Sequence, residues 1–397
     1  MSNQGEKKGV SALDFFCLGF GAIVGVGWAV SINSWMTSCG GPIPAGIGYI
    51  LALVMMVPIA LCYCELVPAL PVAGGGMAFA FRAFNDKVAV ISGWAAFGGF
   101  ISIIPWEAIQ ITDVLGYLIP SLTAGDPLYT VYGTGVHLTT IIIGVICSLL
   151  LFALNMRGLA SAAVLQKILC FVLVGAGILG AIASLIKGNA ANWQPIYDTA
   201  NPMLYGTGEG YIQATNSNML GGILAILSTA PFFLAGFETI PQGVEDAGGD
   251  IKSVGKTVVL SVALACIFYA ILLFCFGFAW PWQEFSTPTA VGGEMTNPAA
   301  ATMLRMLYGG AAGEVLYWII TIGALAGLFT TWNGFFMASA LLLMGMARGR
   351  LMPRIFARQN KNGIPVPALL VCLILSLIGP FAGAGIIGDL TCFSGAA

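Results

Sequence analysis

Long apolar runs recur along the whole chain and leave no polar stretch large enough to fold separately. Of its 397 residues, 58% are hydrophobic and 8% are charged, whereas a soluble chain has about a quarter charged residues. A helix needs about 20 apolar residues to cross a bilayer core. Suitable runs are residues 12–37, 43–70, 88–119, 136–154, 162–186, 220–243, 254–280, 314–346 and 366–380, and a tenth begins near residue 389. The sequence predicts an all-α polytopic membrane protein with one domain over residues 1–397.

Positive charge is unequally divided between the two sides of the predicted bundle. If the runs alternate across the bilayer, thirteen Lys and Arg residues fall on the N-terminal side, and only Lys187 and Arg305 fall on the other. Cytoplasmic loops carry the excess of Lys and Arg, so we expect a plasma (cell inner) membrane protein with a cytoplasmic N-terminus. The net charge of −2 predicts no nucleic-acid partner. On the external side, Asn297 to Leu307 has the apolar spacing of a short helix.

The first run contains a cluster of glycines that is unusual for a membrane helix. Four glycines, at positions 19, 21, 25 and 27, fall within Leu18–Trp28. Each costs about 1 kcal/mol relative to alanine inside a helix, and irregular backbone at membrane depth is tolerated only around a protein-lined site. We therefore predict a discontinuous helix whose freed backbone groups bind a small charged substrate.

A second run, five spans later, has the same weakness. Residues 221–243 contain Pro231, Gly236, Pro241 and Gly243, and Glu238 lies among them. Two interrupted spans at corresponding positions of two halves indicate a transporter site between inverted repeats. The alternative is that both spans are kinked, closely packed helices that use small residues. The coincidence of proline, glycine and an acid favours the site.

The backbone of a discontinuous helix offers both signs of partial charge. Free N–H groups near Gly25 to Gly27 would suit a carboxylate. Free carbonyls of Ile23, Phe232 and Ala235 would suit an ammonium group. A site with both kinds of group fits a zwitterion such as an amino acid.

Several linked motifs resemble the amino acid–polyamine–organocation (APC) family of permeases, in order along essentially the whole chain. They are Gly21-Ala22-Ile23-Val24-Gly25-Val26-Gly27, Glu65-Leu66 followed by Pro71-Val72-Ala73-Gly74-Gly75-Gly76, Gly236-Phe237-Glu238 followed by Val244-Glu245-Asp246, and Ala347-Arg348-Gly349-Arg350-Leu351-Met352-Pro353 leading to Asn362-Gly363-Ile364-Pro365-Val366-Pro367. The resemblance implies the LeuT-like fold, with five-plus-five inverted repeats over residues 12–186 and 220–397 and with alternating access.

The resemblance also implies roles for individual residues. Backbone N–H groups of Val26 and Gly27 would bind the substrate carboxylate beside Gly25. Carbonyls of Ile23, Phe232 and Ala235 would accept from its amine next to Gly236, and the Phe232 ring would close over it as a gate. Phe335 would contact the substrate side chain, although a core position is an alternative.

The chain departs from the family pattern at two points. It ends at Ala397, just inside the tenth run, so we expect the second repeat to be incomplete, and whether the chain is a fragment of a longer permease is left open. Some relatives place a coupling lysine in the fifth span, where this chain has Leu173. Lys167 lies nearer the cytoplasmic end, which argues against proton coupling through that lysine.

Two acids fall inside spans, where an ionisable group costs about 2.5–3.5 kcal/mol. We predict gating or proton coupling for Glu238, either as a protonatable group or as an organiser of the helix end. Glu107 is a candidate for the same role or a buried carboxyl paired with a neighbouring helix. Glu245 and Asp246 follow the second break, where gating salt links and a solvated loop are both open interpretations.

The sequence thus predicts a secondary transporter of an amino acid or related amine, by proton-linked symport or exchange. Thr330 and Thr331 could instead hold a sodium ion beside the first span, although membrane threonines usually bond their own backbone. A nutrient sensor with the permease fold is a further alternative.

A membrane enzyme is disfavoured because the chain has one histidine and lacks a metal-ligand cluster, nucleophile motif and phosphate loop. A channel is disfavoured by the two breaks. We expect no cofactor, and no metal apart from the possible sodium ion at Thr330 and Thr331. The expected partners are the small-molecule substrate and membrane lipid.

Overall fold

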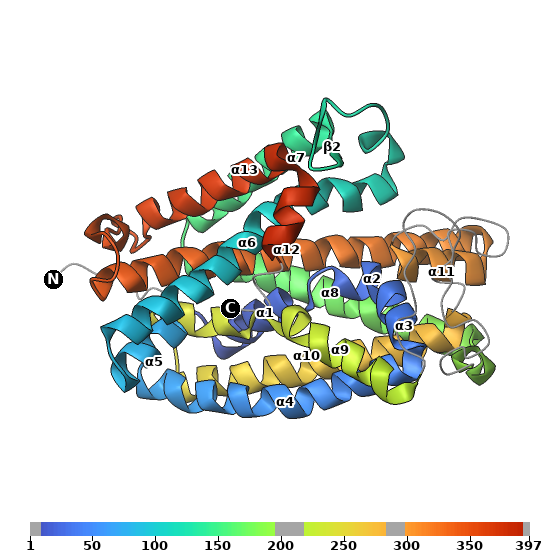
Figure 1. Ribbon diagram of the computed structural model, residues 1–397, viewed down its shortest axis with the longest axis horizontal. Coiled ribbons are helices and arrows are strands. Elements are labelled where there is room, and N and C mark those ends of the chain that lie inside the picture. Colours follow the sequence, from blue (N-terminus) through green and yellow to red (C-terminus); the bar gives the residue numbers. More distant parts are fainter. Residues whose placement is uncertain (1–8, 195–217, 283–297, 392–397) are drawn as a thin grey trace.

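The computed structural model describes residues 9–194, 218–282 and 298–391, and nine helices within them are long and apolar enough to cross a membrane (Figure 1). The α-helices are α1 (Ala12–Val24), α2 (Gly27–Val30), α3 (Ile32–Cys39), α4 (Pro42–Ala69), α5 (Gly75–Ala83), α6 (Asp86–Leu118), α7 (Leu138–Asn155), α8 (Leu159–Lys187), α9 (Met219–Leu234), α10 (Ile251–Ala279), α11 (Ala299–Tyr308), α12 (Gly310–Arg348) and α13 (Val366–Thr391). Short 3₁₀ segments are η1 (Pro120–Leu122), η2 (Ala190–Trp193), η3 (Phe237–Asp246) and η5 (Arg354–Ala357).

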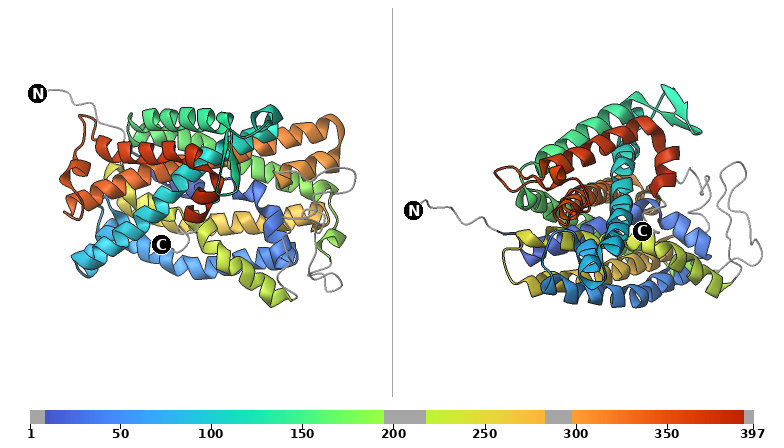
Figure 2. Two further views of the ribbon diagram at one scale, coloured as in Figure 1. Left: turned by 45° about the horizontal axis from the view of Figure 1, so that its top comes forward. Right: turned by 60° about the vertical axis from the view of Figure 1, so that its left-hand side comes forward.

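Three pairs of long helices pack against each other, and the members of each pair are five spans apart. They are α4 with α10, α6 with α12, and α7 with α13. In Figure 1, α4 and α10 run side by side while α6 crosses α12 obliquely, and Figure 2 shows the same bundle from two further directions. Equivalent spans meet in this way when a two-fold axis relates two repeats, so the packing has the predicted five-plus-five order.

Local sequence explains where the first helix starts and how closely the bundle packs. The hydroxyl of Ser11 and the carboxylate of Asp14 form a capping box at the start of α1. In the α4–α10 interface, a Cβ atom on Gly255 would lie 2.5 Å from the carbonyl oxygen of Cys64. Only a residue without a side chain permits this approach, as is common between membrane helices.

The structure refines the predicted spans. Run 12–37 is divided into α1, α2 and α3. Run 366–380 continues to Thr391 across a non-helical Gly383, so the start of the predicted tenth span near 389 lies within α13. Residues 392–397 lie outside the described residues. An antiparallel hairpin, β1 (Tyr129–Val131) and β2 (Thr134–Val136), follows α6 and was not predicted. The predicted external helix is confirmed as α11, although Asn297 lies outside the described residues.

Candidate functional site

Both predicted breaks are present, and they touch each other. In the first, α1 ends at Val24, Gly25 has φ +51°, and α2 begins at Gly27. In the second, α9 ends at Leu234, Gly236 has φ +135°, and the chain continues as the 3₁₀ segment η3. A Cβ atom on Gly236 would lie 2.8 Å from the backbone nitrogen of Ile23. The two interrupted spans therefore meet at Gly236, where only glycine fits both the space and the dihedral angle.

A cavity of about 180 Å³ lies beside the second break. Its walls come from α4, α5, α6, the break itself, η3 and α12, and its lining includes Tyr63, Phe100, Ala235, Glu238, Gln242 and Phe335. The rings of Phe100 and Phe335 form one apolar wall, with centroids 5.5 Å apart. Aromatic rings opposite a carboxylate and an amide make this an amphipathic cavity, which suits a small solute with an apolar part and a charged part.

Glu238 joins the second break to this cavity. Its Oε2 atom accepts a hydrogen bond from the backbone N–H of Gly236 at 2.7 Å. The Thr239 hydroxyl and N–H both donate to the Gly236 carbonyl. Within the described part of the chain, no donor bonds the carbonyl of Ala235. The second break thus leaves one free carbonyl and one carboxylate at the cavity wall.

The first break is covered more completely. The hydroxyl of Tyr269, in α10, lies 3.0 Å from the Ile23 carbonyl and 2.8 Å from the Val24 carbonyl. In contrast, the N–H groups of Val26 and Gly27 donate no hydrogen bond within the described residues. Sequence reasoning missed Tyr269 because a tyrosine within an apolar run gives no signal of its partner. The free N–H groups remain suited to an anion.

The structure separates the predicted aromatic residues into two groups. Phe335 lines the cavity. The Phe232 side chain is 37% exposed and does not line it. Its neighbour Phe233 packs edge-on against Trp35 at 4.7 Å and faces Gly27, where a Cβ atom would lie 3.4 Å from its ring. Sequence reasoning missed Phe233, whose ring lies beside Gly27 of the first break.

Glu107 is buried in α6, with 5% of its surface exposed. Its Oε2 atom has no hydrogen-bond partner among the described residues. Ile103, one helical turn away, lines the cavity, so Glu107 lies on the same face of α6 as the cavity wall. The alternative of a carboxyl paired with a hydroxyl or amide of a neighbouring helix is not observed in the described part of the chain.

A buried amide network joins α7, α8 and α12. Asn155 in α7 donates to Asn333 in α12 at 3.0 Å, and Asn333 donates to Gln166 in α8 at 2.9 Å. Gln166 in turn donates to the carbonyl of Thr330 at 2.9 Å. Such a connected buried network holds three helices in one register. It had no sequence signal, because single amides in apolar runs do not reveal their partners.

Thr330 and Thr331 lie against the first span, as the sodium alternative requires. The Thr330 hydroxyl is 2.8 Å from the Gly21 carbonyl and 2.7 Å from the Gly327 carbonyl of its own helix. The Thr331 hydroxyl is 3.4 Å from the Gly21 carbonyl and 3.2 Å from the Gly327 carbonyl. Oxygen atoms therefore converge there, and the threonines also bond their own backbone.

Two ion pairs link helix ends on the side predicted to be cytoplasmic. Lys167 of α8 contacts Asp14 of α1 at 2.7 Å, while Leu173 of the same helix is fully buried. Arg348 of α12 contacts Glu245 of η3 at 2.6 Å. Glu245 also accepts from the backbone N–H of Ala73 at 2.9 Å. Of the two interpretations of the Glu245 region, the salt link is the one observed.

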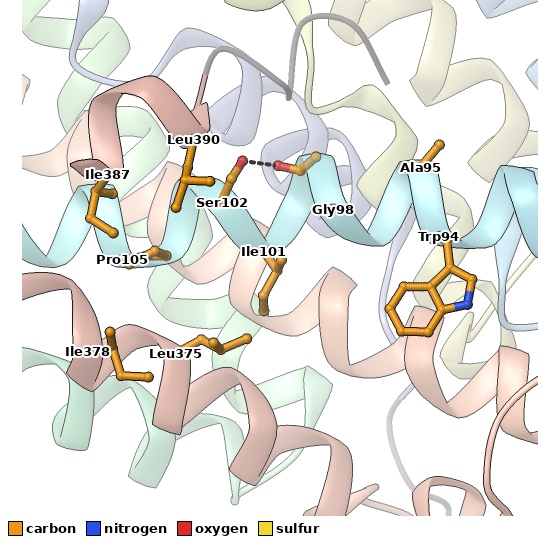
Figure 3. A pocket seen from close by; sticks show the side chains of 11 residues that line it. Trp94, Ala95, Gly98, Ile101, Ser102, Pro105, Leu375, Ile378, Ile387 and Leu390 are labelled. Atoms are coloured by element: carbon orange, nitrogen blue, oxygen red, sulfur yellow. Dashed lines mark hydrogen bonds between the residues drawn. The ribbon is translucent and has the colours of Figure 1, made fainter. Parts of the chain in front are cut away.

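A second cavity, of about 570 Å³, opens between α6 and α13. Figure 3 shows its apolar side chains, among them Trp94, Ile101, Leu375 and Ile378. The hydroxyl of Ser102 donates to the carbonyl of Gly99 on its own helix at 2.9 Å. Because the lining offers no charged group, this cavity suits a zwitterion less well than the cavity beside Glu238.

Comparison with known proteins identifies the family. The family model for amino acid permeases matches residues 10–391. The chain belongs to this family. The match confirms the resemblance to APC permeases and the interpretation as a membrane transporter rather than an enzyme.

Related amino acid permeases and transporters are distant in sequence but match over most of the chain. The branched-chain amino acid permease BcaP of Lactococcus lactis is 23% identical over 93% of this chain and 75% of its own length. The vacuolar cationic amino acid transporter 4 of Arabidopsis thaliana is 22% identical, over 93% of this chain and 57% of its own length.

A solved structure of a sodium-coupled sialic acid symporter in a substrate-bound outward-open state has the same fold. It matches 96% of this permease and 75% of its own chain, with a TM-score of 0.63 at 13% identity. The likeness confirms the predicted LeuT-like fold.

Proposed function

We propose that the chain is a secondary active transporter domain that moves an amino acid or related amine across the cell membrane by alternating access. The observation that carries this proposal is the 180 Å³ cavity beside the second break, with Glu238 and the free Ala235 carbonyl in its wall. Drug-sized ligand sites are about 300–1,000 Å³, so this cavity suits a smaller solute. The names of the related permeases support the same substrate class.

In this proposal, backbone groups hold the two charged ends of the substrate. The free N–H groups of Val26 and Gly27 bind its carboxylate, and the Ala235 carbonyl accepts from its ammonium group. The Ile23 carbonyl retains a second lone pair beside the Tyr269 hydroxyl. Phe335 contacts the substrate side chain. A carboxylate in the cavity wall favours neutral or cationic substrates over acidic ones.

Glu238 and Glu107 are the proposed protonatable groups. Glu238 is bonded to the break, so a change in its charge bears directly on the geometry of Gly236. Glu107 is buried with an unpaired oxygen, and burial of an unpaired charge is costly. Both groups are therefore suited to exchange a proton during the transport cycle, in symport or exchange.

A second candidate is sodium-coupled symport, because the hydroxyls of Thr330 and Thr331 converge with the carbonyls of Gly21 and Gly327. Oxygen ligands of this kind suit hard cations. Replacing Thr331 with Val removes one hydroxyl and keeps the side-chain shape. If sodium drives transport, Thr331→Val abolishes the stimulation of uptake by a sodium gradient. Uptake that is independent of sodium in the wild-type protein excludes this candidate.

Counterflow in proteoliposomes tests the transport function directly. Vesicles preloaded with an unlabelled amino acid should accumulate the same labelled amino acid when the protein is present. A control with empty vesicles separates exchange from leakage. Specific binding without counterflow would instead support the alternative of a permease-fold sensor, and single-channel currents would support a channel.

The orientation proposed here places the N-terminus in the cytoplasm, on the side that carries the greater number of Lys and Arg residues. Lys361, exposed in the loop between α12 and α13, gives a test position when it is replaced with cysteine. A membrane-impermeant thiol reagent applied to intact cells should leave Lys361→Cys no more labelled than the wild-type protein, and lysed cells should show labelling at this position. Labelling of Lys361→Cys above the wild-type level in intact cells contradicts the orientation.

A further inference from the structure

A pocket lined by arginines opens where α12 ends, on the side predicted to be cytoplasmic. Its volume is about 350 Å³, and its lining consists of Ala347, Arg348, Arg350, Arg354, Ala357 and Arg358. We propose that this arginine pocket binds a phosphate group at the membrane surface, supplied by the headgroup of an anionic phospholipid. The proposed orientation of the chain is needed only to assign the pocket to the cytoplasmic side of the membrane.

The pocket gathers positive charge that is largely unpaired. Of these four arginines, Arg348 is the one with an ion pair among the described residues, to Glu245. Arg350, Arg354 and Arg358 are exposed and line the same space without an acidic partner there. Four guanidinium groups around one pocket repel each other unless an anion lies between them. Planar guanidinium groups match phosphate oxygens in charge and geometry.

Backbone hydrogen bonds hold the segment that carries the arginines. The Leu351 N–H donates to the Met346 carbonyl at 2.9 Å, and the Arg358 N–H donates to the Ile355 carbonyl at 3.1 Å. Arg350 has φ +62°, a conformation that non-glycine residues rarely adopt. Such conformations concentrate at ligand sites. The segment therefore presents a preformed pocket.

Position favours a lipid over a dissolved anion. The pocket follows the cytoplasmic end of a membrane-spanning helix, and Ile355, within η5, exposes 49% of its surface beside Arg354. An apolar side chain next to a basic pocket at this depth matches a headgroup site with its acyl chains in the bilayer. Basic pockets between helices on this side of a membrane are known to bind anionic headgroups.

The pocket is coupled to the second break through Arg348. Its Nη1 atom donates to both carboxylate oxygens of Glu245, at 2.8 and 2.6 Å. Glu245 lies at the end of η3, and it also accepts from Ala73 before α5. A phosphate in the pocket competes with Glu245 for Arg348 and so loosens η3 from α12. Because exposed ion pairs contribute at most about 1 kcal/mol, anionic lipid should change the uptake rate by no more than about fivefold.

Lipid binding by the purified protein tests the pocket without requiring transport. The probe is fluorescent phosphatidylglycerol in phosphatidylcholine nanodiscs, with Arg354→Gln/Arg358→Gln as the site variant. The control, Arg82→Gln/Arg157→Gln, removes the same charge from the same side outside the pocket. Each arginine that bonds the phosphate directly contributes about tenfold to binding of the lipid, so the site variant should bind about 100-fold more weakly than the wild-type protein. At physiological salt the control loses only screened surface attraction and should lose far less.

Equal weakening in the two double variants would show diffuse surface attraction and overturn the proposal. Inorganic phosphate distinguishes the sources of the anion: if it displaces the lipid at millimolar concentration from the wild-type protein and not from the site variant, a dissolved phosphate is the occupant. Failure of displacement leaves the lipid as the occupant. Selective lipid binding without counterflow would contradict the transport function and leave the pocket intact.

Discussion

Both breaks contain residues that weaken a helix, but they expose different backbone groups. At the first break, the Tyr269 hydroxyl covers the carbonyls of Ile23 and Val24, and N–H groups remain free. At the second break, the N–H of Gly236 donates to the Glu238 carboxylate, and the Ala235 carbonyl remains free. The first break thus offers mainly N–H groups, with one lone pair left on the Ile23 carbonyl, and the second break offers a carbonyl oxygen. Side chains from neighbouring elements therefore decide which backbone groups of each break are available to a zwitterion.

The largest expected effect comes from the glycine at which the breaks meet. Gly236→Ala places a Cβ atom 2.8 Å from the Ile23 nitrogen at φ +135°. Backbone strain and overpacking together should lower the free energy of unfolding by about 2–5 kcal/mol. Gly27→Ala is the control from the other break, because its Cβ atom would lie 3.4 Å from the Phe233 ring. Thermal unfolding in detergent should separate the two, and equal stability would contradict the close approach.

Glu238→Gln separates the structural role of this residue from its proposed proton role. The glutamine carbonyl can still accept from the Gly236 N–H, so the break should persist. A glutamine does not titrate, so uptake should fall about 10-fold or more and lose its dependence on external pH. Uptake in proteoliposomes across a pH series measures both. Full pH dependence in this variant removes Glu238 from proton coupling, and Glu107→Gln then tests the other acid.

Tyr269→Phe removes the side chain that distinguishes the first break. The carbonyls of Ile23 and Val24 lose their hydroxyl donor while the ring is kept. An unsatisfied buried acceptor costs about 1–3 kcal/mol, which should appear as lower thermal stability. The carbonyls thus freed should also weaken the preference for the substrate carboxylate at this break. Unchanged stability would show that the hydroxyl does not hold the break.

The smallest expected effect is at the ion pair between α1 and α8. Lys167→Gln removes the contact to Asp14. The Lys167 side chain is 32% exposed and the Asp14 side chain is 14% exposed. Such a partly exposed pair contributes at most about 1 kcal/mol. Uptake should keep its pH dependence, because the predicted position of the coupling lysine of some relatives is Leu173, which does not titrate. Loss of pH dependence in Lys167→Gln would assign the coupling to this lysine instead.

The breaks were predictable because glycine and proline act on the backbone locally. The spacing of Gly25, Gly27 and Gly236 carried that information without any knowledge of packing. The five-span interval between the breaks indicated two repeats, and the pairs α4–α10, α6–α12 and α7–α13 follow that order. Tyr269 could not be predicted, because its partner Ile23 is 246 positions away and only tertiary packing brings them together. The sequence also could not show which of Phe232 and Phe233 faces the first break, because adjacent residues of a helix point about 100° apart.

A variant with a filled cavity tests whether the amino acid binds in the cavity beside the second break. Ala96 lines the cavity beside the second break, and Ala96→Phe should fill it. Ala153→Phe, at an exposed position of α7, makes the same change outside the cavity. A ligand at about 100 times its dissociation constant stabilises a protein by about 2.7 kcal/mol, so an amino-acid screen by thermal shift reports binding. We predict a shift in the wild-type protein and in Ala153→Phe, and none in Ala96→Phe. An undiminished shift in a folded Ala96→Phe protein would place the amino acid elsewhere.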